Sequence, residues 1–238
     1  MIPGRKPERI EQEREVVIEV DAAKLAGDLI LPHGARGLVL FAHGSGSNRR
    51  SPRNLYVAEI LQSRGIGTLL FDLLTRSEGV IDELNMEFRF DIPLLAKRLI
   101  GATRWTLSAG GIDGMKIGYF GASTGAGAAL VAAAELPEVV AAIVSRGGRP
   151  DLAGNALGRV RAPTLLIVGG ADKPVITMNQ KALAQLNCTE KKLVIVPGAS
   201  HLFAEPGSME KVAHLAADWF SRRFLRAEKA RFAIAGNS

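Results

Sequence analysis

Short apolar runs alternate with stretches of helical periodicity along most of this 238-residue chain. The runs are GLVLFAH at 37–43, GTLLFD at 67–72, MKIGYF at 115–120, VVAAIV at 139–144, APTLLIVGG at 162–170 and KLVIVPG at 192–198. Continuous apolar character is typical of strands that are covered on both faces. Strands that alternate with helices predict an α/β fold with a doubly wound, mostly parallel sheet flanked by helices.

The remaining segments complete this picture of one domain. Helices are expected at 52–64, 91–107, 123–135, 176–186 and 208–226, and two further strands at 14–20 and 25–31. Ser51 and Pro52 suit the N-cap and first position of the first helix. A chain of this length suits a single domain, which we expect at 14–228, with a polar lead-in at 1–13 and a tail at 229–238.

Composition excludes several classes of protein. The chain is 47% hydrophobic and 23% charged, which is ordinary for a globular protein. Its charged N-terminus lacks the apolar centre of a secretory signal, and no segment suits a membrane-spanning helix. The single cysteine, Cys188, cannot form an intrachain disulfide, and we interpret it as a buried apolar residue. We therefore expect a cytoplasmic protein.

Much of the net charge of +6 lies at the C-terminus, where five basic residues face one acid between 222 and 238. Aromatic interleaving and nucleic-acid motifs are absent from the sequence. We interpret this segment as a solvated helix end with a tail, and we expect no nucleic-acid partner.

The strand at 115–120 leads directly into Gly121-Ala122-Ser123-Thr124-Gly125, a G-x-S-x-G motif. In such an elbow a serine lies on a sharp turn between strand and helix, and side chains at the flanking glycine positions would clash. The free N–H groups of the following helix point toward developing negative charge. The motif predicts that Ser123 is a nucleophile.

A nucleophilic serine needs a histidine base and a carboxylate that orients the base. Asp172 follows the strand at 162–170, and His201 follows the strand at 192–198, in the order expected after such an elbow. Two alternatives for the acid stay open: Asp172 as a turn or cap residue, and Asp151 in its place. His201 could also be a loop residue without chemistry. The other histidines are poorer candidates; these are His33, His43 and His214.

An acyl-transfer site also needs two N–H donors for the oxyanion. We expect one from Thr124 and the other from the glycine-rich loop at 43–48, through Ser45 or, alternatively, Gly46. A plain surface turn is the competing interpretation of that loop. His43 is expected to anchor the loop rather than to titrate.

With these residues in place, the chain resembles the dienelactone hydrolase-like branch of the α/β-hydrolase superfamily. The resemblance rests on FAHGSGSNRRSPRN (41–54), GYFGASTGAGAAL (118–130), VGGADKPV (168–175) and VPGASHLFAEPG (196–207). It is similar in particular to small bacterial α/β-hydrolases, some of which are fused to phosphoribosyltransferases. Dienelactone hydrolase proper uses a cysteine nucleophile, whereas this elbow carries Ser123, so dienelactone is not the expected substrate.

These features together predict a serine hydrolase that cleaves a small carboxylic ester or thioester through an acyl-enzyme, without a metal or organic cofactor. About 17 residues separate the strands that end near 144 and begin near 162, so we expect a minimal lid or none. Loop arginines could attract an acidic substrate, although solvated surface arginines are the competing interpretation. The arginines are Arg49, Arg50, Arg53, Arg76, Arg146 and Arg149.

Two other functions remain open at this point. One is an amidase or acyltransferase of the same fold, and the other is a non-catalytic interaction module. The oligomeric state is left open.

Overall fold

The computed structural model describes residues 10–108, 112 and 114–235, with the backbone alone at 10, 11 and 226–235. Residues 1–9 of the expected lead-in and 236–238 of the expected tail lie outside the described residues. An eight-stranded sheet has the order β1-β2-β4-β3-β5-β6-β7-β8. β1 and β2 pair antiparallel, as do β2 and β4, and the other neighbours are parallel. The mostly parallel sheet predicted from the sequence is confirmed.

The elements follow one another along the chain as expected for repeated strand–helix units. The strands are β1 (Ile10–Val20), β2 (Ala23–Pro32), β3 (Gly37–Ala42), β4 (Gly67–Phe71), β5 (Lys116–Ala122), β6 (Val140–Arg146), β7 (Thr164–Gly169) and β8 (Lys191–Val196). The helices are α1 (Pro52–Gln62), α2 (Arg76–Asn85), α3 (Ile92–Ser108), α4 (Thr124–Glu135), the 3₁₀ helix η1 (Pro150–Arg159), α5 (Lys173–Gln185) and α6 (Ser208–Ala235).

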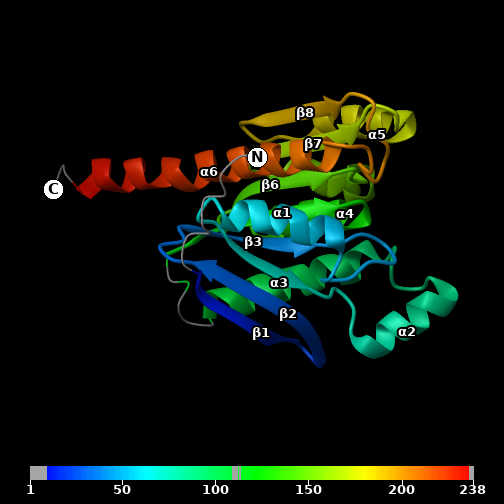
Figure 1. Cartoon of the computed structure of the whole chain (residues 1–238), viewed down its shortest axis with the longest axis horizontal. Helices are drawn as coiled ribbons and strands as arrows, with labels where there is room; N and C mark the ends of the chain where they lie inside the picture. The colour runs from blue at the N-terminus through cyan, green and yellow to red at the C-terminus, as the bar shows by residue number, and fades with distance from the viewer. Residues whose placement is uncertain (1–9, 109–111, 113, 236–238) are drawn as a thin grey trace.

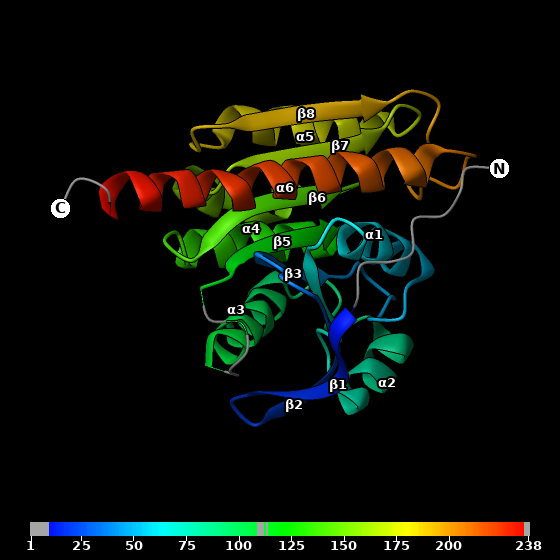
Figure 2. The ribbon, with the colours of Figure 1, turned by 60° about the vertical axis from the view of Figure 1, so that its left-hand side comes forward.

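Helices cover both faces of the sheet. α1 and α6 lie on one face, and α3, α4 and α5 lie on the other (Figure 2). Each face holds its own apolar cluster, with Phe41, Phe120 and Trp219 fully buried under α1 and α6, and Tyr119 buried on the opposite side. The fully buried central strands explain why their sequences are continuously apolar.

A glycine in a central strand lets α6 pack closely. A Cβ at Gly118 of β5 would lie 2.6 Å from the ring of Phe220 on α6. Phe220 stacks in turn on Phe224, with ring centroids 5.7 Å apart. The small residue on the sheet and the aromatic pair on the helix therefore fit together.

Several predicted boundaries need correction. β1 begins at Ile10 rather than at 14, because its first residues pair with the far end of β2. α5 begins at Lys173 rather than at 176, and α6 continues to Ala235 rather than ending near 226. Ser51 does occupy the N-cap of α1, but its side chain makes no capping hydrogen bond.

The sequence interpretation missed α2 entirely. This helix lies to one side of the main body and connects β4 with α3 (Figure 1). Its N-terminus carries a capping box, in which Thr75 and Glu78 each accept a hydrogen bond from the other residue's backbone N–H. That T-x-x-E pattern is a recognised signal of a helix start and could have revealed α2.

The segment between β6 and β7 holds only η1, which packs against α4 and α5, so no long insertion forms a lid there. Among the residues that the structure describes, no helix is long and apolar enough to cross a membrane.

Candidate active site

Ser123 lies between the end of β5 and the start of α4, in a strained backbone conformation. Its φ is +49° and its ψ is −122°, a region that residues other than glycine adopt rarely and mostly at functional sites. The flanking glycines are required by close approach. A Cβ at Gly121 would lie 2.5 Å from the Cα of Ala126, and one at Gly125 would lie 2.2 Å from the carbonyl oxygen of Ala42. The elbow therefore presses directly against the end of β3.

Backbone hydrogen bonds connect the elbow to β6. The N–H of Ser123 donates to the carbonyl of Arg146 at 3.2 Å, and the carbonyl of Ser123 accepts from the N–H of Arg149 at 3.0 Å. These bonds, together with the N–H of Ala126, surround the serine on both sides. The strained turn is therefore held by its surroundings, which is the condition under which strain persists.

Asp172 and His201 meet at the same edge of the sheet. The Nδ1 atom of His201 lies 2.6 Å from Oδ2 of Asp172, a short contact of the charge-assisted kind. The Asp172 side chain is 13% exposed and that of His201 is 40% exposed, so the carboxylate is the more sheltered partner. Asp172 stands at the N-cap of α5 without capping it by its side chain, so its carboxylate is directed to the histidine instead.

The two loops that carry this pair are held together. The N–H of Ala171 donates to the carbonyl of Ala199 at 2.9 Å. The N–H of Ser200 donates to Glu205 at 2.9 Å, which lowers the pKa of the Glu205 carboxyl. Glu205 was missed in the sequence analysis, and its role is to close the loop that carries His201.

His201 also approaches the strand beside the elbow. A Cβ at Gly147, directly after β6, would lie 3.6 Å from Cε1 of His201 and 3.0 Å from its carbonyl oxygen. Gly147 has a φ of +51°, so both its conformation and its contact with the histidine favour glycine. Ser123 and His201 are thus both in contact with the end of β6.

The loop at 43–48 lies against the elbow on the other side. The hydroxyl groups of Ser45 and Thr124 are 3.0 Å apart and form a hydrogen bond. A Cβ at Gly44 would lie 3.0 Å from Cβ of Ser123. Gly46 has a φ of +64°, as expected of a glycine that turns the loop. The two chain segments expected to supply oxyanion donors are therefore neighbours.

His43 anchors this loop, as the sequence interpretation proposed. Its Nε2 atom accepts a hydrogen bond from the N–H of Leu73 at 3.0 Å, so the proton lies on Nδ1, which donates to the carbonyl of Gly44 at 3.1 Å. Burial lowers the pKa of His43, because the charged ring would lose its hydration. The neutral ring ties β3 to the segment after β4.

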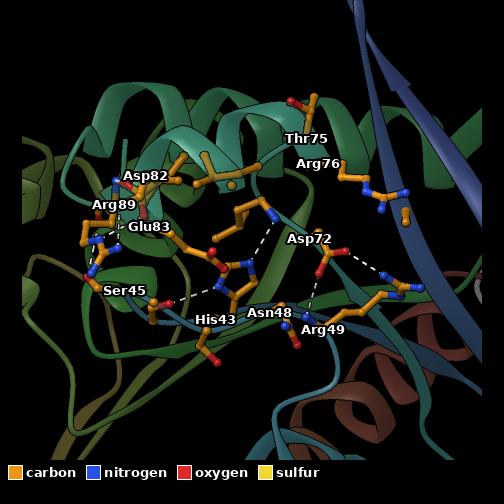
Figure 3. Close-up of a pocket in the computed structure, with 18 of the residues that line it drawn as sticks. His43, Ser45, Asn48, Arg49, Asp72, Thr75, Arg76, Asp82, Glu83 and Arg89 are labelled. Atoms are coloured by element: carbon orange, nitrogen blue, oxygen red, sulfur yellow. Dashed lines mark hydrogen bonds and ion pairs between the residues drawn. The ribbon is translucent and has the colours of Figure 1, made fainter. Parts of the chain in front are cut away.

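A cavity of about 460 Å³ opens beside this loop. Its walls come from the loop at 43–49, the end of β4 and helix α2 (Figure 3). Thr124 and Ser45 line it as well, so the cavity reaches the residue that follows Ser123. It was not predicted from the sequence, since one of its walls is the missed α2.

Several of the charged groups around this cavity form ion pairs. Arg49 contacts Asp72 at 2.6 Å, and Arg89 contacts Asp82 at 2.9 Å (Figure 3). Arg49 also contacts Asp28 at 3.0 Å. Asp82 is buried and also accepts the backbone N–H groups of residues 88 and 89. These ion pairs build the wall and the floor of the cavity.

The six arginines considered for substrate binding have different surroundings. Arg49 and Arg149 are held by carboxylates, the latter by Asp151. Arg50 is exposed and lies 3.4 Å from Glu15. Arg76 is exposed and lines the cavity. The remaining two, Arg53 and Arg146, meet no carboxylate among the described residues.

The alternative residues are occupied elsewhere. Asp151 makes a two-pronged ion pair with Arg149, whereas the carboxylate that His201 contacts is that of Asp172. His33 is exposed in a turn, and His214 lies on α6, 3.7 Å from Glu210. Cys188 is buried, as expected. Within residues 10–108, 112 and 114–235, no three His, Cys, Asp or Glu side chains are grouped so that they could hold a metal ion.

The chain is similar to known proteins both in sequence and in structure. Residues 96–235 match a family model described as PET hydrolase-like. A crystal structure of dienelactone hydrolase from Anabaena variabilis is 60% identical in sequence, with a TM-score of 0.87 over 89% of this chain and 98% of that one. Est1E from Butyrivibrio proteoclasticus, at 16% identity, has the same fold, with a TM-score of 0.72 over 89% of this chain and 99% of that one.

A longer relative is found in Mycobacterium tuberculosis. The chain is 55% identical over 211 residues to a putative phosphoribosyl transferase of that organism, covering 88% of this chain and 46% of the relative. The chain thus spans about half the length of this curated relative.

Proposed function

The chain belongs to the dienelactone hydrolase-like family of α/β-hydrolases, and from this premise we propose that it is a serine hydrolase of small carboxylic esters or thioesters. The observation that carries the proposal is the 2.6 Å contact between His201 and Asp172 at the sheet edge where Ser123 lies in a strained elbow. Ester cleavage of this kind needs a nucleophile, a base and an orienting carboxylate, and these residues supply all three.

In the proposed mechanism, Ser123 attacks the acyl carbonyl while His201 accepts its proton. Asp172 holds the imidazole in the tautomer with the proton on Nδ1, so that Nε2 is free to act as the base. His201 then donates the proton to the departing alcohol or thiol. A water molecule activated by His201 cleaves the acyl-enzyme and restores Ser123.

The oxyanion of each tetrahedral intermediate is proposed to bind the backbone N–H of Thr124 and that of Ser45 or Gly46. The contact between Ser45 and Thr124 supports this assignment, because it keeps the loop and the start of α4 together. Donors held in place before the reaction need not reorganise as charge develops, and losing one costs about 3 kcal/mol in the barrier.

The cavity beside Thr124 supports a small substrate. A volume of about 460 Å³ lies within the range of ordinary small-molecule sites. We propose that it accepts one side of the ester, with α2 as its outer wall.

The test is hydrolysis of p-nitrophenyl acetate by the wild type and by Ser123→Ala. We expect the variant to lose at least about 10⁴-fold in kcat/KM, and a fluorophosphonate probe to label the wild type at Ser123 alone. Ser108→Ala, an exposed serine at the end of α3, is the matched control and should keep full activity. Equal rates for Ser123→Ala and the wild type would refute the triad.

Two other outcomes separate the remaining functions. Faster turnover of amides, or transfer of the acyl group to an added alcohol, would identify an amidase or acyltransferase with the same residues. A protein that neither turns over esters nor reacts with the probe would favour a non-catalytic interaction module.

A further inference from the structure

Arg146 occupies the position between the proposed nucleophile and the proposed base. It is the last residue of β6, and its carbonyl oxygen accepts the N–H of Ser123. The next residue, Gly147, lies against the ring of His201. The backbone of Arg146 therefore lies beside the candidate site, and its side chain extends from there to Asn54 on α1.

The Arg146 side chain is largely buried, and no carboxylate of the described residues pairs with it. The residue is 6% exposed, and its Nε atom is buried with no hydrogen-bond partner. Within the described part of the chain, its guanidinium makes one long hydrogen bond, of 3.5 Å from Nη2 to Oδ1 of Asn54 on α1. Burial, and then the charge of Arg53, lower the pKa of Arg146 to about 10. At neutral pH it is still charged.

Arg53, which is half-buried, brings a second positive charge close enough to act on Arg146. It lies in the first turn of α1, next to Asn54, and its own Nε atom is buried without a partner. The charge of Arg53 is the one that acts on Arg146, and no carboxylate does so. The two guanidinium groups thus lie on the same side of the candidate site, and their like charges repel each other.

The other sheltered arginines of the described chain each have a carboxylate partner, although the Nε atoms of Arg98 and Arg223 also lack a hydrogen bond there. Arg49 meets Asp28 and Asp72, Arg89 meets Asp82, and Arg98 meets Glu78. A buried charge without a partner destabilises a protein strongly, which is why such pairing is the rule. Two neighbouring arginines that meet no carboxylate among the described residues, beside a candidate active site, are therefore explained best by a ligand that supplies the missing negative charge.

We propose that Arg53 and Arg146 form an anion subsite that binds a phosphate group carried by the substrate of this hydrolase. A phosphate monoester is a dianion, so it neutralises both guanidinium groups, whereas a carboxylate neutralises only one. Its oxygens also suit two-pronged hydrogen bonds from the planar arginine side chain. This inference rests on the proposed ester hydrolysis for the identity of the site, but its first test does not depend on activity.

The first test measures binding of inorganic phosphate by calorimetry at about pH 8, where phosphate is mainly dianionic, at constant ionic strength. We expect Arg53→Met and Arg146→Met each to weaken phosphate binding at least 10-fold, and acetate to bind the wild type at least 10-fold more weakly than phosphate. Arg159→Met, which removes an exposed arginine paired with Glu135, is the control and should bind phosphate as the wild type does. Circular dichroism verifies that each variant is folded. If Arg146→Met does not fold, phosphate binding by Arg53→Met alone decides the test.

Several results would overturn the proposal. These are absence of phosphate binding by the wild type, equal binding by folded Arg53→Met, and acetate binding as tight as that of phosphate. The second test is inhibition of p-nitrophenyl acetate hydrolysis, in which phosphate should raise KM and leave kcat unchanged. Ester hydrolysis that phosphate does not affect would overturn the subsite, whereas phosphate binding by a protein without esterase activity would refute the proposed function instead.

Discussion

Arg49 and Arg146 both lie at the edge of the sheet where the parallel strands end, and both are largely buried, but their surroundings are opposite. Arg49, beyond β3, contacts two carboxylates and forms part of the cavity wall. Arg146, at the end of β6, has a neighbouring arginine and meets no carboxylate in the described part of the chain. The difference indicates that the first arginine stabilises the fold, whereas the second keeps its charge at a cost to stability. The two arginines therefore have different roles, although both lie at the same edge of the sheet.

The largest expected effect contrasts these two arginines directly. Arg49→Met leaves Asp28 and Asp72 as sheltered, unpaired carboxylates, and should lower the free energy of unfolding by about 3 kcal/mol. Arg146→Met removes an unpaired buried charge and should raise it by about 1 kcal/mol. Urea denaturation near neutral pH measures both. A loss of similar size in both variants would mean that Arg146 is as structural as Arg49.

The second effect concerns Asp82, the buried carboxylate on the cavity side. Asp82→Asn replaces one acceptor oxygen by an amide that faces the donor of Arg89, and should lower the free energy of unfolding by about 2 kcal/mol. Glu83→Gln, at the exposed neighbouring position, is the control and should change it by less than about 0.5 kcal/mol. Equal losses of stability in the two variants would show that the ion pair between Asp82 and Arg89 does not stabilise the cavity wall.

A smaller effect is expected at His43, which lies directly after β3 in the loop that also carries Arg49. Because burial lowers its pKa in the folded state, the unfolded chain binds more protons below the ordinary value of 6.5. The contribution of His43 to stability is thus complete above that pH, and is lost as the pH falls through the lowered folded pKa. His43→Asn should flatten the fall in unfolding free energy between neutral and mildly acidic pH.

The control for that measurement is the same exchange at His33, an exposed turn residue. It should leave the dependence of stability on pH as it is in the wild type. If the unfolding free energy of His43→Asn falls with pH as steeply as that of the wild type, the neutral His43 ring is not the cause of the loss of stability in acid.

The smallest effect is expected in α2, the outer wall of the cavity. A Cβ at Gly79 would meet no atom within 4 Å, and glycine is a poor helix former. Gly79→Ala should therefore raise the free energy of unfolding by about 0.5–1 kcal/mol, measured as a higher midpoint of thermal unfolding. A lower midpoint would mean that α2 needs the freedom of glycine at this position.

Most strands and helices could be predicted from the sequence, because burial on both faces leaves a continuous apolar run at each central strand. Helix α2 escaped detection because it is only ten residues long and its few apolar side chains, such as Val80 and Leu84, are exposed rather than part of the core. Its signal was the capping box at Thr75 and Glu78, which is local and readable. The cavity could not be predicted without that helix.

The sequence by itself determined the order of strands and helices, the position of Ser123 in an elbow, and the positions of Asp172 and His201 after later strands. These are local properties of period, turn chemistry and chain order. Only the tertiary structure decided which arginines are neutralised, because the partners of Arg49 lie more than 20 residues away along the chain. Whether two charges pair depends on their distance in space, and the order of residues along the chain does not show that distance.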